Sequence, residues 1–204
     1  MSLEIFGYSQ SRAFRALWMA EEIKLAKGVD FEHTNSSPMP GPELDALLAL
    51  NPMGQVPVIR DDGLVLRESM AINLYLAKKY GVLSLSTLEE EALAWQWSFW
   101  VMTAVESHTL EALKYKIGMM GVEQNDEKVD VEMEALSRPL SVLEKHLSSQ
   151  SHLINGSFSV ADLNVASVLM WLRMGQIDTT SYDVVNKWLD SSLEREAVTA
   201  ARQH

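Results

Sequence analysis

The pattern of apolar residues changes once along this chain, at about residue 80, and this change constrains the fold more than any other feature. Before it, short runs with the alternation of β-strands are interleaved with stretches in which apolar residues recur every three or four positions. After it, only the helical spacing returns. The sequence therefore predicts a small α/β domain followed by an all-α domain.

The first 80 residues are expected to form a mixed sheet covered by helices. Asp62 and Gly63 separate two β-rich runs, and an Asp-Gly pair supplies the positive φ angles of a tight hairpin turn. Pro42 suits the first turn of a short helix, which Asn51-Pro52 ends. The expected strands are 3–6, 29–34, 56–60 and 64–66, and the expected helices are 12–24, 42–50 and 69–80.

The rest of the chain is expected to be helical. We place the α/β domain at 1–80, a linker at 81–88 and the helical domain at 89–204. Ser159 and Asp162 have the spacing of a capping box at a helix start. The expected helices are 87–116, 130–147 with Pro139 inside it, one from 160 onward, 183–189 and 193–202.

Charge and composition exclude several functions. The 204 residues include 17 basic and 28 acidic side chains, a net charge of −11, so the chain repels a phosphate backbone and nucleic acid is not an expected partner. There is no cysteine, which excludes a thiol nucleophile from the protein itself, and the histidines lack metal-ligand spacing, so no metal is expected. No stretch has the length and hydrophobicity of a membrane span, the first residues lack a secretory pattern, and the cytoplasm is the expected compartment.

The first segment with chemical potential is 8–12, where a strand passes into a helix. Backbone N–H groups and the positive end of the helix dipole favour an anion there. A hydroxyl at this point, from Ser9 or Ser11, can donate to a thiolate and keep it ionised. The alternative is that these serines only cap the helix.

The second segment is 51–59, in which a proline follows directly on Gln55-Val56. Pro57 at the start of an apolar strand marks an edge and is a candidate for a cis bond. The backbone of Val56 could then pair with a peptide-like ligand, as in recognition at a sheet edge. The alternative is that Pro57 only ends the strand.

The third segment is 66–72, where Glu68 and Ser69 precede a helix. Ser69 and the N–H groups behind it form an anion site, while Glu68 could hold an ammonium group. Together they match the carboxylate and amine of an amino acid. The alternative is an ordinary helix start.

Four motifs occur together: Ser11-Arg12-Ala13-Phe14-Arg15-Ala16-Leu17-Trp18, Asn51-Pro52-x-Gly54-Gln55-Val56-Pro57, Glu68-Ser69-x-Ala71-Ile72-x-x-Tyr75-Leu76 and Ser159-Val160-Ala161-Asp162. In this combination the chain resembles the glutathione transferases, and the first motif is similar to that of bacterial and fungal serine-type members. The resemblance covers the whole chain and is most specific in residues 51–76.

The resemblance implies a thioredoxin-like first domain that binds glutathione as co-substrate. It also implies a helical second domain that supplies most of the pocket for a small hydrophobic electrophile. By similarity, Val56 pairs its backbone with the cysteinyl part of glutathione beside a cis Pro57. Gln55 hydrogen-bonds the tripeptide, while Glu68 and Ser69 bind its γ-glutamyl amine and carboxylate.

By the same resemblance, a first-loop hydroxyl stabilises the thiolate, with Ser11 ranked first, Ser9 second and Tyr8 third. The thiolate then attacks an electrophilic carbon, a disulfide or a peroxide, so the expected activity is that of a glutathione transferase, with peroxidase as a second activity. The family suggests a role in detoxification and stress response and a homodimer.

Two positions are further candidates for the substrate pocket, Arg12 in the first loop and Tyr115 in the helical half. One departure is that the loop 35–41 has no basic residue, where family members often hold the glycine carboxylate of glutathione. The alternative function is a non-catalytic binding or regulatory protein on the same fold.

Overall fold

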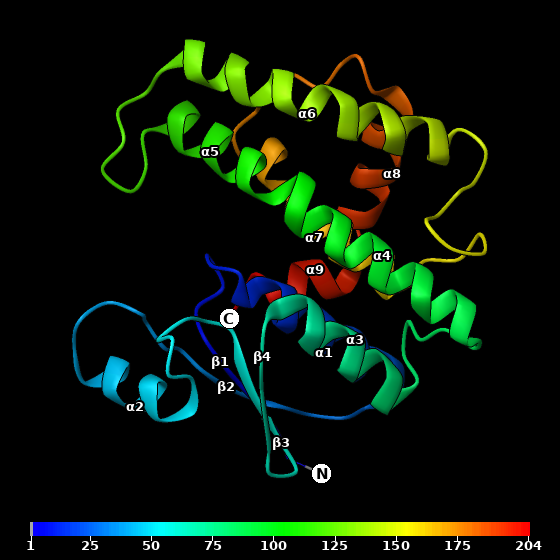
Figure 1. Cartoon of the computed structure of the whole chain (residues 1–204). Coiled ribbons are helices and arrows are strands. Elements are labelled where there is room, and N and C mark those ends of the chain that lie inside the picture. Colours follow the sequence, from blue (N-terminus) through cyan, green and yellow to red (C-terminus); the bar gives the residue numbers. More distant parts are fainter. Residues whose placement is uncertain (1) are drawn as a thin grey trace. The chain divides into compact units, whose positions relative to one another are not determined.

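The structure is a computed structural model that describes residues 2–204, and it divides into two compact units. One comprises the chain up to Leu85 together with Arg195–His204, and the other is Ser86–Glu194. Figure 1 labels the helices and strands of both units.

The first unit is built on a four-stranded mixed sheet. Its strand order is β2-β1-β3-β4, in which β1 is parallel to β2, and β3 is antiparallel to both β1 and β4. Asp62 and Gly63 both have positive φ between β3 and β4, so the predicted hairpin turn is confirmed. The strands are β1 (Leu3–Phe6), β2 (Glu32–Thr34), β3 (Val58–Asp61) and β4 (Leu64–Arg67).

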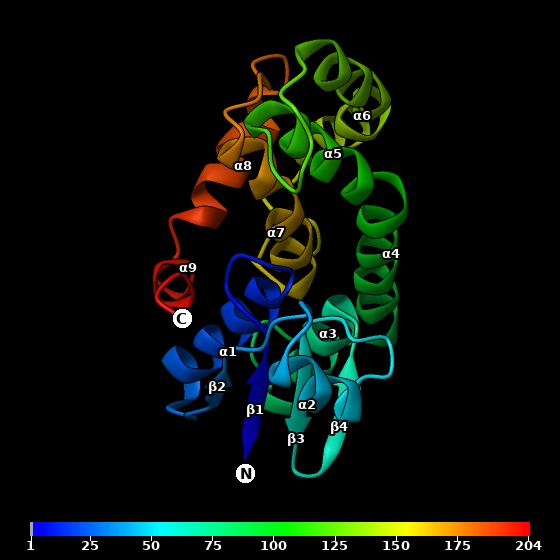
Figure 2. The ribbon, with the colours of Figure 1, turned by 90° about the vertical axis from the view of Figure 1, so that its left-hand side faces the viewer.

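Three helices accompany this sheet, α1 (Ala13–Lys27), α2 (Pro42–Leu50) and α3 (Ser69–Tyr80). Helices α1 and α3 pack against each other, with α1 also on β1 and α3 on β4. Leu17 and Leu76 are fully buried there because the apolar positions of both helices recur at helical spacing. Helix α2 lies to the left of the strands in Figure 1 and in front of them in Figure 2.

The last helix, α9 (Glu196–Ala201), belongs to the first unit and packs on α1. From the sequence alone, these residues were expected in the helical half. The guanidinium of Arg195 forms two hydrogen bonds with the carboxylate of Glu22 on α1, at 2.6 and 2.7 Å. A single contact of 2.7 Å joins Nε2 of His204 to a carboxylate oxygen of Glu21, also on α1. Helical spacing cannot reveal these pairs, because their members lie more than 170 positions apart.

The second unit is entirely helical in the described residues and has α7 at its centre. Helix α7 is buried along nearly its whole length and packs against α4, α5 and α8. Together with the strands and helices of the first unit, these elements confirm the predicted thioredoxin-like α/β domain and helical domain. The helices are α4 (Leu88–Ala104), α5 (Glu106–Ile117), α6 (Asp126–Leu147), α7 (Val160–Met174) and α8 (Asp183–Leu193).

The single helix predicted for 87–116 is wrong. The backbone leaves helical geometry at Val105, with φ −128° and ψ −47°, and two helices result. No glycine or proline marks this break in the sequence, and Val105 is fully buried. In contrast, α6 runs through Pro139 as one helix, and the capping box of Ser159 and Asp162 is confirmed.

None of the helices that the structure describes combines the length and hydrophobicity needed to span a membrane.

Candidate active site

The sheet brings all three predicted segments to one of its ends. In the register, Phe6 at the end of β1 lies opposite Val58 at the start of β3, and Val58 lies opposite Arg67 at the end of β4. The segments 7–12, 51–57 and 68–69 adjoin these three positions. The antiparallel order of β1, β3 and β4 therefore assembles the candidate site.

Gly7 determines how closely the first loop approaches the cis-proline segment. Its φ is +140°, and a Cβ atom built on it would lie 2.5 Å from Cβ of Ala13 and 3.1 Å from Cβ of Val56. Only glycine fits between these two neighbours. Gly7 was not among the predicted site residues, although a glycine directly after a strand is the signal that could have revealed it.

The serine hydroxyls of the first loop are engaged within the protein. Ser11 Oγ donates to the carbonyl of Tyr8 at 2.6 Å and accepts from the backbone N–H of Ala13 at 3.1 Å. Ser9 Oγ donates to the carbonyl of His204 at 3.2 Å. Either hydroxyl must turn away from its carbonyl before it can donate to a ligand. Tyr8 itself is half-buried.

The second segment contains a cis peptide bond between Val56 and Pro57, as predicted. Gln55 before it is exposed, Val56 is half-buried and Pro57 is buried. The side-chain amide of Gln55 and part of Val56 are therefore accessible to a ligand.

Asn51 holds this segment in place and was missed as a positioning residue. Its side-chain Nδ2 donates to the carbonyl of Gln55 at 2.8 Å. Its Oδ1 accepts from the backbone of Met53 and from Nη1 of Arg67, both at 3.1 Å. The bond to Arg67 joins the second segment to the end of β4, beside the third segment.

In the third segment, Ser69 is the first residue of α3 and is 5% exposed. Glu68 before it is exposed and has φ +69° and ψ 109°, an uncommon conformation for a residue other than glycine. Residues held in such conformations cluster at functional sites. Arg15 of α1, which is 1% exposed, donates from Nη1 to Ser69 Oγ at 3.2 Å.

The charges around the site are uneven. Arg12 and Arg67 are exposed at the first and third segments. Between residues 28 and 59 there is neither lysine nor arginine. Within this stretch Glu43 accepts from the backbone N–H of Ser37 at 3.1 Å, so a carboxylate lies against the loop before α2.

The pocket residues predicted from sequence fall in different units, Arg12 in the first and Tyr115 in the second. The ammonium of Lys128 on α6 lies 4.7 Å from the centre of the Tyr115 ring. This contact covers part of the ring.

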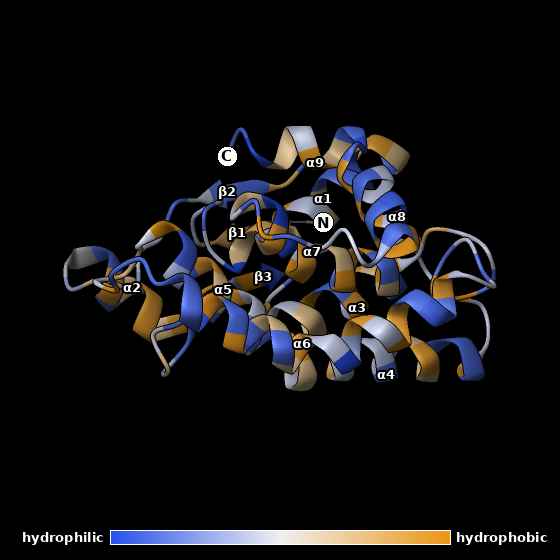
Figure 3. Cartoon of the chain, turned by 90° about the horizontal axis from the view of Figure 1, so that it is seen from above, coloured by the Kyte–Doolittle hydropathy of each residue, from blue (hydrophilic) through white to orange (hydrophobic). Residues whose placement is uncertain are grey.

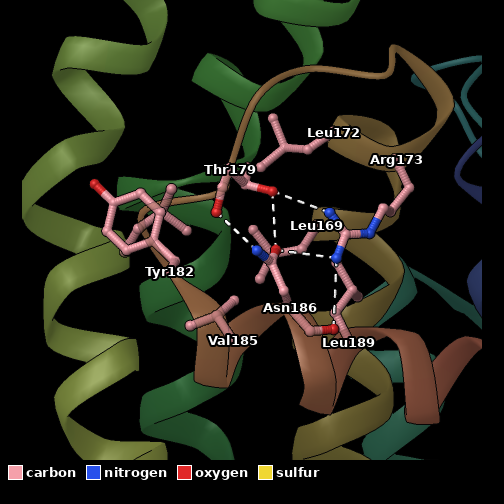
Figure 4. Close-up of a pocket in the computed structure, with 9 residues that line it drawn as sticks. Leu169, Leu172, Arg173, Thr179, Tyr182, Val185, Asn186 and Leu189 are labelled. Atoms are coloured by element: carbon pink, nitrogen blue, oxygen red, sulfur yellow. Dashed lines mark hydrogen bonds between the residues drawn. The ribbon is translucent and has the colours of Figure 1, made fainter.

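A small recess lies between α6, α7 and α8 (Figure 4). Its polar members bond one another: Arg173 donates to Thr179 at 2.9 Å and to Oδ1 of Asn186 at 3.0 Å, and Asn186 donates to the carbonyl of Thr179 at 2.7 Å. These bonds fasten the connection between α7 and α8. We therefore assign the recess a structural role, and Tyr115 is not among its lining residues.

Comparison with known proteins matches both halves of the chain. The family model described as "Glutathione S-transferase, N-terminal domain" matches residues 1–78, and the one described as "Glutathione S-transferase, C-terminal domain" matches residues 94–196. A relative named glutathione S-transferase theta-1, from Bos taurus, is 31% identical over 83% of this chain and 73% of its own length.

Two further similarities bear on function. Elongation factor 1-gamma from Artemia salina is 28% identical over 97% of this chain, which spans 45% of that longer protein. The structure of glutathione S-transferase-I bound with the ligand lactoylglutathione has a TM-score of 0.83 and 27% identity, and the match covers 98% of each chain.

Proposed function

This chain belongs to the glutathione S-transferase family, and we propose that it is an active transferase that binds glutathione at the end of its sheet. The observation that carries the proposal is the strand register, which gathers the first loop, the cis-proline segment and the start of α3 at one place. The product of the proposed transferase is the conjugate of glutathione with a small hydrophobic electrophile.

The γ-glutamyl and cysteinyl parts of glutathione each have a partner in this proposal. The γ-glutamyl carboxylate lies at Ser69 and the N-terminus of α3, and the amine lies at Glu68. The cysteinyl backbone pairs with Val56, and the amide of Gln55 hydrogen-bonds the tripeptide. The exposure of Gln55 and Glu68 supports these roles.

The chemical step needs the thiolate of glutathione. The N-terminus of α1, Arg12 and a hydroxyl of the first loop favour the ionised thiol, with Ser11 ranked before Ser9 and Tyr8. The thiol proton leaves to solvent. The thiolate sulfur then forms a bond to the electrophilic carbon, and the leaving group departs with its electron pair. Tyr115 is our candidate for contact with the electrophile.

We place the protein in the cytoplasm as a homodimer and infer a role in detoxification or the stress response. Support for a dimer comes from α4, which exposes the large apolar side chains of Leu88, Leu93, Trp95 and Phe99. In Figure 3, parts of this helix are coloured as hydrophobic.

Two observations favour a second function, a non-catalytic glutathione-binding module. The Ser11 hydroxyl donates its hydrogen bond to the Tyr8 carbonyl, and a relative over nearly the whole chain is named elongation factor 1-gamma. A module of this kind would bind glutathione without lowering the pKa of its thiol. Peroxide reduction stays a prediction, because none of the contacts described above distinguishes it from conjugation.

An ultraviolet titration of glutathione with and without the protein separates these functions. The thiolate absorbs ultraviolet light more strongly than the thiol, so absorbance against pH gives the pKa of the bound thiol, which is about 8.5 for a free thiol. We expect a bound value closer to neutral pH in the wild type and a loss of that shift in Ser11→Ala or Ser9→Ala. Ser141→Ala, an exposed serine of α6, is the matched control and should not change the titration.

Saturable binding without a shift would establish the module instead of the transferase. Absence of binding would refute both functions.

A further inference from the structure

Arg15 is an arginine with an unusual degree of burial. Of the basic side chains that the structure describes, it alone is buried, at 1% exposure. Burying a guanidinium costs free energy unless its N–H groups are hydrogen-bonded. Arg15 lies in the first turn of α1, which packs against α3, so the start of α3 is where its role is sought.

The contact with Ser69 fixes the direction of a hydroxyl proton. Arg15 Nη1 donates to Ser69 Oγ at 3.2 Å. A guanidinium has donors and no acceptor, so Ser69 cannot return its own proton to Arg15. Because Arg15 donates to one lone pair of Oγ, the Ser69 hydroxyl can donate its own hydrogen to another acceptor.

Arg15 also adds charge to an anion site. The backbone N–H groups at the start of α3 already favour a negative group. A buried cation interacts through a lower dielectric than exposed Arg12 or Arg67, and dissolved salt screens it less. The two effects, an oriented hydroxyl and a buried positive charge, both select a carboxylate.

We propose that Arg15 is a positioning residue that makes Ser69 specific for the α-carboxylate of a γ-glutamyl ligand. Arg15 acts through Ser69 and does not itself touch the ligand. The inference rests on the proposed function in that glutathione supplies the carboxylate.

The test is calorimetric titration with two ligands, glutathione and its analogue in which 4-aminobutyrate replaces the γ-glutamyl residue. The analogue keeps the amine and lacks only the α-carboxylate. We expect Arg15→Met to raise the Kd for glutathione about tenfold, the loss typical of one charge-assisted hydrogen bond, and to change the Kd for the analogue less than about twofold. Arg15→Lys, which keeps the charge without the planar fork, should fall between the two proteins.

A second mutation tests whether Arg15 acts through Ser69. In a Ser69→Ala background, Arg15→Met should cause little further loss of glutathione affinity, because the hydroxyl to be positioned is gone. The control is Arg60→Met, which removes an exposed arginine that pairs with Glu4 in the same unit and should leave both titrations unchanged. Circular dichroism establishes that each variant is folded, and Arg15→Lys carries the test where Arg15→Met does not fold.

Acetate provides a readout that does not depend on glutathione. Acetate should shift the backbone amide signal of Ser69 in NMR spectra of the wild type, and the response should weaken in the Arg15 variants. This result would support the inference even if glutathione itself failed to bind and the proposed function fell. An equal loss for both ligands, additive losses in the double variant, or an acetate response that is absent from the wild type or unchanged in the variants would overturn the inference.

Discussion

Gly7 shows how much of the site depends on one small residue. It lies between Ala13 of α1 and Val56 before the cis proline, so the first loop and the second segment can approach only where no side chain intervenes. The conformation at φ +140° adds a second reason for glycine. Substitution at this position therefore tests both the packing and the backbone.

We expect Gly7→Ala to lower the free energy of unfolding by about 3 kcal/mol, because the new methyl group meets Ala13 at 2.5 Å and the backbone is strained. Urea denaturation measures this change. The matched control is Gly28→Ala, also at positive φ but with open space around the new Cβ, which should cost about 1 kcal/mol. Equal losses in the two variants would show that the close approach to Ala13 contributes nothing.

Tyr80 links the pH of the solution to the stability of the first unit. Its hydroxyl donates to Oδ1 of buried Asp61 at 3.1 Å, and Lys79 pairs with Oδ2 of the same carboxylate at 2.7 Å. Burial, and then the negative charge of Asp61, raise the pKa of Tyr80 to about 12. This group lies at the end of the sheet opposite to the candidate site, since Asp61 pairs with Leu3 and Leu64.

Because the pKa of Tyr80 is higher in the folded than in the unfolded chain, where tyrosine titrates near 10, its stabilising contribution is complete below about pH 10. It is lost as the pH rises through about 12. We therefore expect the destabilisation caused by Tyr80→Phe, measured by urea denaturation, to be smaller at pH 11 than at pH 8. Thr109→Val, which removes a buried hydroxyl that donates to the carbonyl of Glu106 at 2.9 Å and does not ionise in this pH range, should show no such change. A constant difference for Tyr80→Phe would contradict this account.

At the scale of elements, one carboxylate fastens three parts of the helical unit. Asp162, fully buried near the start of α7, accepts from the backbone and hydroxyl of Ser159 at 3.0 and 2.9 Å. Its other oxygen accepts from the backbone of Leu153 and from the indole of Trp188 on α8, both at 3.0 Å. The start of α7, the preceding loop and α8 are thereby joined at one side chain.

Removing Asp162 leaves several buried donors without an acceptor. We expect Asp162→Ala to lower the free energy of unfolding by about 3 to 5 kcal/mol, as for other buried, fully bonded charges. Asp190→Ala removes an exposed aspartate that pairs with Arg173 in the same unit, and it should cost about 1 kcal/mol or less. Thermal and urea denaturation measure both values. A loss below about 1 kcal/mol for Asp162→Ala would show that the three parts do not depend on it.

At the scale of the whole molecule, the proposed homodimer requires an apolar surface. Phe99 on α4 is 67% exposed, which leaves a large apolar area of an aromatic side chain in contact with solvent. Light scattering coupled to gel filtration should therefore give the wild type about twice the 22.9 kDa mass of one chain.

Phe99→Glu should reduce this mass to that of one chain at low micromolar concentration, because a charge would be buried at the contact. Val131→Glu, at a similarly exposed apolar position on α6, is the control and should remain dimeric. A wild type with the mass of one chain, or equal effects of both variants, would refute the role of α4 in a dimer.

Features that arise between near neighbours in the chain could be predicted without a structure. The hairpin at Asp62-Gly63, the capping box at Ser159 and the cis bond at Pro57 were all predicted from a few consecutive residues. The α/β class of the first domain and the all-α class of the second followed from hydrophobic periodicity, which indicates the buried face of each element. The motifs around Gln55 and Glu68 were likewise visible without a structure.

The tertiary structure brings distant residues together in ways that no local pattern predicts. It separated α4 from α5 at Val105, where packing overrides a continuous helical pattern. It joins α9 to α1 through the hydrogen bonds of Arg195 with Glu22. It also places the Ser11 hydroxyl where it donates to the Tyr8 carbonyl. It also placed Arg15 against Ser69, 54 positions away. Local sequence encodes the dihedral and capping preferences of each segment, whereas these contacts depend on how the completed elements pack and on which charges they bury together.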